Sequence, residues 1–142
     1  MNPATLPLTD RARRVLKRAE AERDRLGHHV LTPQHLAWAL VAEKGSIARS
    51  VLEGLAFDPW LLERQLGPDW HATGPGKAGD ENPLVAADES ARALGHSCVD
   101  TAHLLLGILR RENRVSKFLR AQGVTYAAAA EATDRLWTRA VG

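Results

Sequence analysis

The chain has 142 residues, enough for one compact domain, and its single cysteine, Cys98, excludes an intrachain disulfide. The chain has 19 lysines and arginines against 17 aspartates and glutamates, so it is not strongly basic. Hydrophobic residues make up 44% of the chain, which is typical of a soluble protein. No apolar run approaches the roughly 20 residues that a membrane helix needs, and residues 1–9 lack a signal-peptide pattern. We therefore expect a cytoplasmic protein with one domain over 1–142 and no contact with membranes.

Helical periodicity predicts four helices in residues 8–66. Apolar residues fall at helical spacing from Leu8 to Leu26, with Thr9 as the N-cap and Gly27 as the stop. Thr32-Pro33 opens a second helix, because a capping residue precedes a proline at the first helical position. Two further helices are predicted from Ile47 to Gly54 and from Pro59 to Leu66.

The middle of the chain changes character. Residues 67–81 are rich in glycine and proline and predict a surface linker. The helical pattern resumes at Asn82-Pro83, which opens a helix shorter than its counterpart in the first half. Three more helices are predicted at Thr101–Arg111, Val115–Ala121 and Tyr126–Val141.

The second half of the chain repeats the first. Leu26-Gly27-His28 recurs as Leu94-Gly95-His96, and His35-Leu36 recurs as His103-Leu104, in the same order and at the same offset. A repeated order of motifs is the signature of a duplicated structural unit. The sequence therefore predicts an all-α fold of about eight helices in two pseudo-symmetric four-helix repeats, one over 8–66 and one over 82–137.

Several of these motifs carry a family resemblance. The segments that carry it are Leu8-Thr9-Asp10-Arg11-Ala12-Arg13-Arg14-Val15-Leu16, Thr32-Pro33-Gln34-His35-Leu36 and Asp100-Thr101-Ala102-His103-Leu104. In this order they resemble the N-terminal Clp repeat domain of Clp-type AAA+ unfoldases, especially of the ClpC and ClpA kind. The resemblance covers about residues 8–137. It implies binding of substrate proteins, adaptor proteins or some cyclic-peptide antibiotics.

The ATPase modules of those unfoldases have no counterpart in this sequence. A nucleotide-binding loop needs two glycines at fixed spacing before a lysine and a hydroxyl residue, and Gly74-Pro75-Gly76-Lys77 is followed by Ala78. The sequence thus predicts a free-standing, non-catalytic protein- or peptide-binding module of a Clp chaperone–protease pathway, which acts as an adaptor, a substrate receptor or a decoy. Its expected partners are proteins or peptides, a separate Clp ATPase or a cyclic peptide. We expect no cofactor.

The loops that open the second helix of each repeat are the candidate partner-binding site, because helix N-termini offer free backbone N–H groups. The resemblance implies that in some Clp N-terminal domains a glutamate in each loop binds phosphorylated arginine. Gln34 and Ala102 occupy those positions, so both carboxylates are missing and phosphoarginine binding stays open. The candidate residues are Thr32, Pro33, Gln34, Asp100, Thr101 and Ala102.

The first helix offers an alternative function. A possible face for an anionic partner consists of Arg11, Arg14, Arg18 and Arg25. Such a face would suit a small nucleic-acid-associated regulatory protein. Glu20, Glu22 and Asp24 interrupt it, however, and a salt-bridged, solvated face is the commoner outcome. Nucleic acid is therefore the less favoured partner.

The repeated histidines raise the question of a metal. In each repeat two histidines lie seven residues apart, at His28 and His35 and at His96 and His103. A zinc site needs four ligands and usually has closer pairs, so we expect no metal. We expect instead that His35 and His103 hydrogen-bond to the backbone of the preceding loop.

The other reactive or aromatic residues are expected to be structural. Cys98 lies in an apolar run beside Val99, where a buried thiol is inert. Trp38 and Trp60 occupy helical positions that are typical of packing residues and not of an aromatic binding cage. Trp70 and Trp137 each end a repeat and are expected to be partly exposed.

Overall fold

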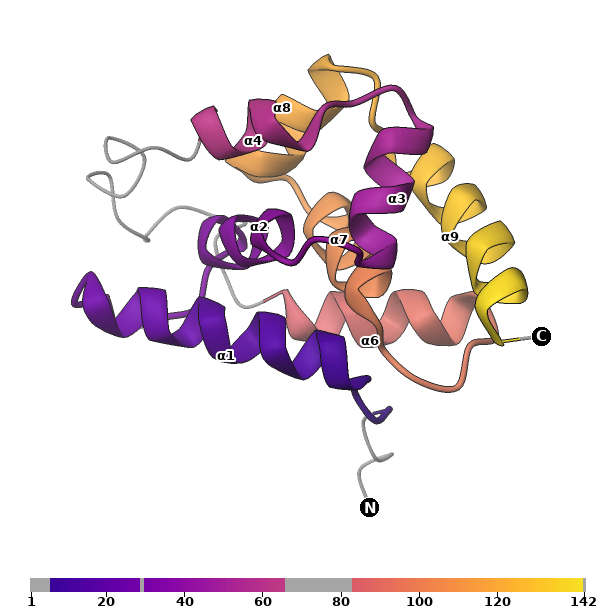
Figure 1. Cartoon of the computed structure of the whole chain (residues 1–142), viewed down its shortest axis with the longest axis horizontal. Helices are drawn as coiled ribbons and strands as arrows, with labels where there is room; N and C mark the ends of the chain where they lie inside the picture. The colour runs from indigo at the N-terminus through magenta and orange to yellow at the C-terminus, as the bar shows by residue number, and fades with distance from the viewer. Residues whose placement is uncertain (1–5, 29, 66–82, 142) are drawn as a thin grey trace.

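A computed structural model describes residues 6–28, 30–65 and 83–141, and within these ranges the chain forms eight helices (Figure 1). The first four are α1 (Asp10–Arg25), α2 (Pro33–Ala42), α3 (Ile47–Gly54) and α4 (Pro59–Gln65). The second four are α6 (Leu84–Ala93), α7 (Thr101–Arg110), α8 (Arg114–Ala121) and α9 (Tyr126–Val141). The predicted linker over 67–81, which includes Trp70, lies outside the described residues. None of the described helices is long and apolar enough to cross a membrane.

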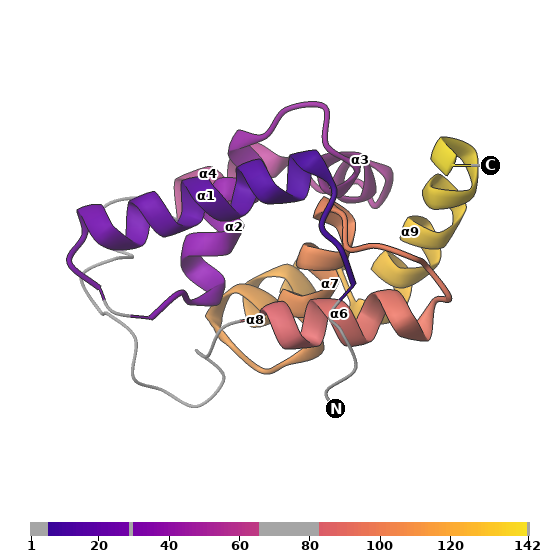
Figure 2. The ribbon, with the colours of Figure 1, turned by 90° about the horizontal axis from the view of Figure 1, so that it is seen from below.

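The helix starts follow from their capping residues, with one correction. Thr9 is the N-cap of α1, and its hydroxyl accepts the N–H of Ala12 at 3.2 Å. Leu8 was predicted to belong to this helix, which is wrong, because the extended backbone of Thr9 ends the helix there. Leu8 instead forms a parallel β-bridge with Val99, and Figure 2 shows this segment running from α1 down to α6.

The two halves of the chain have equivalent helix ends and equivalent contacts. Gly27 and Gly95 follow α1 and α6 with φ of +74° and +75°, a conformation that glycine adopts without strain. In repeat one α1 and α4 pack on α2, and in repeat two α6 and α9 pack on α7. The helices α2 and α7 meet in the centre of the molecule (Figure 1). The all-α fold with two pseudo-symmetric four-helix repeats is therefore confirmed.

The core lies around these two central helices. Leu36 of α2 and Leu104 of α7 occupy the same position in the two repeats and are completely buried. Full burial of one leucine contributes about 1.5–3 kcal/mol. Gly107 allows α6 to approach α7 closely, because a Cβ at this position would lie 2.7 Å from the carbonyl oxygen of Pro83 and 2.8 Å from the nitrogen of Ala87.

Of the two tryptophans that were predicted to be packing residues, one packs against the core and one does not. Trp38 is half-buried and packs against the core. Trp60, in contrast, is 54% exposed, so the prediction of an interior position is wrong. Pro59 and Leu62 take the buried face of the short helix α4, and Trp60 therefore points outward, where the guanidinium of Arg64 lies 4.8 Å from its ring centre.

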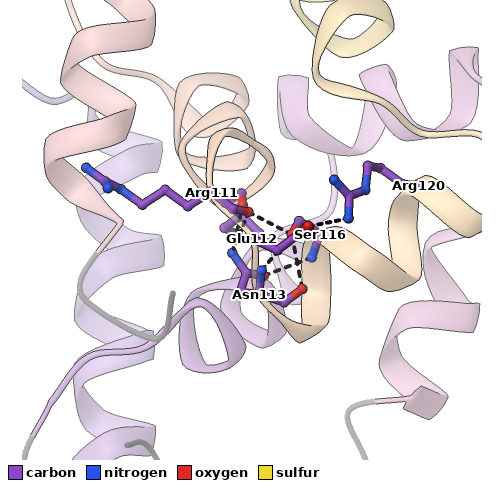
Figure 3. Close-up of polar contacts among 6 residues, drawn as sticks. Arg111, Glu112, Asn113, Ser116 and Arg120 are labelled. Carbon is purple, nitrogen blue, oxygen red and sulfur yellow. Dashed lines mark hydrogen bonds and ion pairs between the residues drawn. The ribbon is translucent and has the colours of Figure 1, made fainter. Parts of the chain in front are cut away.

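The connection between α7 and α8 is held by a buried polar network (Figure 3). Asn113 is the N-cap of α8, and its side-chain oxygen accepts the N–H of Ser116 at 2.8 Å. The backbone N–H of Asn113 donates to the hydroxyl of Ser116 at 2.9 Å, and its amide group donates to the carbonyl of Ile108 at 2.9 Å. An ion pair between Arg120 and Glu112 covers the outside. These groups satisfy one another, so we interpret the network as structural.

Candidate functional site

A histidine holds the start of the central helix in each repeat. Nδ1 of His35 accepts the backbone N–H of Thr32 at 3.0 Å, and Nδ1 of His103 accepts that of Asp100 at 2.8 Å. Each histidine is the third residue of its helix and so takes the place that a glutamate has in a capping box. The prediction that these two histidines hydrogen-bond to the backbone is confirmed.

A second histidine contacts the first in both repeats. Nδ1 of His28 lies 2.9 Å from Nε2 of His35, and Nδ1 of His96 lies 2.8 Å from Nε2 of His103. Burial, and next the neighbouring His96, lower the pKa of His103 to about 4, so its ring is neutral at pH 7. Its Nδ1 accepts the hydrogen bond from the Asp100 N–H, which places the ring hydrogen on Nε2. Within 6–28, 30–65 and 83–141, no cluster of three or more potential ligands could hold a metal ion.

In repeat two, α9 closes over the histidine pair. Nε2 of His96 lies 2.9 Å from a carboxylate oxygen of Asp134. The indole of Trp137 stacks on the His96 ring at a centroid distance of 4.5 Å, with 11° between the planes, and presents an edge contact to His103 at 5.2 Å. Sequence reasoning did not pair α9 with these histidines.

The six candidate residues of the two loops are all buried. Two of them connect the repeats, because the Thr9 hydroxyl donates to Asp100 at 2.6 Å and the N–H of Ala48 donates to the Thr101 hydroxyl at 3.2 Å. Gln34 is 6% exposed, and its side-chain oxygen has no hydrogen-bond partner among the residues that the structure describes. Partner binding by these residues stays a prediction.

A cavity of about 450 Å³ lies where α1, the α6–α7 loop and α9 meet. Its lining residues are Thr9, Asp10, Arg11, Gly45, Ile47, Ser97, Cys98, Asp100 and Trp137. It brings together Arg11 and Asp100, which belong to the two different sets of candidate residues. Burial, and next the charge of Asp100, raise the pKa of the Cys98 thiol, which agrees with an unreactive cysteine.

A smaller, mainly apolar groove of about 210 Å³ lies between α6 and the segment before α1. Its lining residues are Leu6, Leu8, Leu84, Val85, Asp88 and Val99. Val85 is 64% exposed, the largest exposure among the exposed large hydrophobic residues of the described chain. The Asp88 carboxylate accepts the backbone N–H of Leu6 at 2.8 Å and bonds the Arg92 guanidinium at 2.8 Å. Sequence reasoning missed this groove because it assigned Leu8 to the buried stripe of α1.

The four arginines of the possible anionic-partner face are all exposed. Three of them already contact groups of the chain itself. Arg14 lies 3.3 Å from Glu43, Arg25 pairs with Glu22, and Arg11 donates to the carbonyl of Gly45. These contacts favour a solvated, salt-bridged face over a nucleic-acid interface.

Comparison with known proteins finds relatives that are similar to this chain in sequence. The negative regulator of genetic competence ClpC/MecB of Bacillus subtilis is 31% identical over 124 residues, and the chaperone protein ClpB of Oceanobacillus iheyensis is 30% identical over 127 residues. Each match covers 82% of this chain but 15% of the relative. The chain thus spans about 15% of the length of these relatives.

Solved structures share the fold at low sequence identity. A protein from a study of a malarial protein secretion system gives a TM-score of 0.77 at 18% identity, covering 94% of this chain and 97% of that chain. The Hsp104 N-terminal domain from Candida albicans gives 0.68 at 15% identity, covering 92% and 91%. The family model described as the Clp repeat (R) N-terminal domain matches twice in succession, over residues 7–83 and 80–141. The chain therefore belongs to the Clp repeat N-terminal domain family.

Proposed function

We propose that this chain is a non-catalytic protein-binding module of a Clp chaperone–protease pathway, in which it acts as an adaptor, a substrate receptor or a decoy. Its ligand is an extended, apolar segment of a partner polypeptide. The observation that carries the proposal is the exposed apolar groove between α6 and the segment before α1. Membership of the Clp repeat family supports the pathway.

The groove can supply binding energy through apolar contacts. Leu6, Leu8 and Leu84 form its wall, and Val85 stands at its edge with most of its side chain in solvent. A leucine-sized side chain that moves from water into such a site gains about 1.5–3 kcal/mol. Several such contacts along one segment are needed to offset the cost of ordering it.

The backbone beside the groove suits an extended ligand. Val99 donates its N–H to the carbonyl of Pro7 at 2.8 Å and accepts the N–H of Thr9 at 3.0 Å. Alternate residues of an extended chain point their hydrogen-bonding groups to opposite sides, so the N–H and C=O of Leu8 face away from Val99. A peptide strand that pairs with this edge would gain main-chain hydrogen bonds as well as apolar contacts.

The proposal places the contact on the groove and not on the six buried loop residues, because a partner would have to unpack the core to reach their side chains. The charge of the groove is also small. Asp88 is the one charged residue in the described lining, and its carboxylate already bonds Leu6 and Arg92. Binding should therefore depend only moderately on salt.

Fluorescence anisotropy with labelled casein, an unfolded apolar protein, tests the proposal. Val85→Lys should weaken binding about tenfold, because it places a charge at the edge of the groove. The matched control is Val30→Lys, since Val30 is 45% exposed and lies outside the groove. Equal affinities of the two variants, or no binding by the wild type, would contradict the proposal. Binding of a labelled DNA duplex that falls steeply with salt and is lost in Arg18→Ala would favour the nucleic-acid alternative.

A further inference from the structure

The histidine pair of repeat two belongs to a continuous relay of hydrogen bonds. It runs from the backbone N–H of Asp100 to His103, from His103 to His96, and from His96 to Asp134 on α9, over distances of 2.8, 2.8 and 2.9 Å. Both rings are buried, and Trp137 stacks on His96. Through this relay α9 is connected to the start of α7.

Each gap of the relay has room for one hydrogen. The N–H of Asp100 fills the first gap, so neutral His103 carries its hydrogen on Nε2 and donates it to Nδ1 of His96. His96 then carries its own hydrogen on Nε2 and donates it to Asp134. A further proton on either ring has no acceptor. It brings two N–H groups face to face, either between the histidines or between His103 and Asp100.

We propose that this relay is a proton-sensitive latch that holds α9 against the start of α7 near neutral pH and opens in mildly acidic solution. Opening of the latch also affects the contacts between the two repeats. Asp100 also accepts the hydroxyl of Thr9 on repeat one, and the adjacent Thr101 accepts the N–H of Ala48 at the start of α3. Adding a proton thus loosens the contact between the two repeats.

Other charges act on the relay from several sides. The Asp134 carboxylate lies 2.9 Å from Nε2 of His96, and the charge of Asp100 acts to raise the pKa of His103. Burial and the mutual repulsion of the two rings act in the opposite direction, and they prevail at His103. Asp10, Arg11 and Cys98 line the cavity beside Trp137. On the neighbouring helices, Arg92 bonds Asp88, Arg49 donates to the carbonyl of Val41, and Arg120 pairs with Glu112.

Repeat one supplies an internal comparison. His28 and His35 form the same ring contact, but His28 is only half-buried, whereas His96 lies beneath α9. The His28 ring therefore lies nearer to solvent, and a proton on it is not expected to change the position of α9. The latch is a property of the second pair, and changes at His28 should leave it intact.

Nuclear magnetic resonance of the ¹⁵N-labelled chain between pH 7.5 and 5 tests the latch. Ring ¹⁵N spectra should show the Nε2–H form of both His96 and His103 at pH 7.5. As the pH falls, hydrogen-exchange protection factors of the amides at 127–137 should drop about tenfold or more, in step with loss of the neutral His96 signal. Unchanged protection factors in the wild type, or other ring forms at pH 7.5, would overturn the proposal.

One variant and a control make the test specific. In His96→Gln the side-chain amide can accept from His103 and donate to Asp134 without titrating, so α9 protection should fall much less on acidification than in the wild type. His28→Gln should keep the pH dependence of the wild type. If His96→Gln does not fold, a loss of α9 protection in the wild type that does not accompany the loss of the neutral His96 signal overturns the latch.

Discussion

The hydroxyl of Thr9 and the carboxylate of Asp100, 91 residues apart in the sequence, form a hydrogen bond of 2.6 Å. The two residues are the N-caps of α1 and α7, so the bond joins the start of a helix in repeat one to the start of a helix in repeat two. The Thr9 hydroxyl also accepts the N–H of Ala12 at 3.2 Å. One side chain thus caps its own helix and connects the repeats.

Thr9→Ala removes both roles, and we expect it to lower the free energy of unfolding by about 2 kcal/mol or more, because loss of an N-cap alone costs about 1 kcal/mol. Urea denaturation at pH 7 measures the change. Thr125→Ala is the matched control, since the Thr125 hydroxyl accepts the N–H of Ala128 at 3.2 Å in an exposed position. Equal losses in the two variants would mean that the bond to Asp100 contributes nothing.

Gly107→Ala should destabilise the chain by about 1–3 kcal/mol, because the new methyl group would force α6 and α7 apart. A Cβ at Gly107 meets backbone atoms of Pro83 and Ala87, which cannot rotate away as a flexible side chain could. Thermal denaturation followed by circular dichroism measures the change. Gly54→Ala provides the control, since a Cβ there meets nothing within 4 Å, and it should be neutral or slightly stabilising. A neutral Gly107→Ala variant would contradict the close packing of these helices.

The sequence was sufficient to predict the helices, the repeats and the bonds of His35 and His103 to the backbone, because each depends on neighbours within one or two helical turns. It was not sufficient for contacts between distant segments. Periodicity shows which face of α9 is apolar, but not that Asp134 and Trp137 meet His96. Likewise, Leu8 continues the apolar spacing of α1, and only the pairing with Val99 places it beside the groove.

The buried ring of His103 should make stability depend on pH. Its pKa is lowered to about 4 in the folded chain, against 6.5 for an ordinary histidine, so the unfolded chain binds a proton that the folded chain does not bind between these values. Stability should therefore fall as the pH decreases from about 6.5 to about 4, by roughly 3 kcal/mol over the whole window at about 1.4 kcal/mol per pKa unit.

Urea denaturation at pH 7 and pH 5 checks this dependence. His103→Gln should be less stable than the wild type at pH 7, because it loses the packing of a buried imidazole ring. It should also lose less stability on acidification. The matched variant at the half-buried position, His28→Gln, should lose stability on acidification as the wild type does. A stability of the wild type that does not change between pH 7 and pH 5 would show that His103 is not held neutral by burial.

The loops at Gln34 and Ala102 allow a test of phosphoarginine binding. The resemblance to Clp N-terminal domains implies that glutamates at these positions hold the guanidinium, so we expect the wild type to bind free phosphoarginine weakly or not at all. Gln34 is 6% exposed, so a glutamate at this position avoids the cost of burying its charge by turning outward, where its carboxylate can meet a guanidinium; Gln34→Glu should therefore strengthen binding.

Adding Ala102→Glu should help less than the symmetry of the repeats suggests. Ala102 is 1% exposed, so a carboxylate there must unpack the core or be buried without a partner, which costs several kcal/mol. The double variant should therefore be less stable than Gln34→Glu alone. Titration calorimetry with free phosphoarginine, together with urea denaturation, separates binding from stability. Tight binding by the wild type would show that the backbone N–H groups at the helix starts suffice without either glutamate.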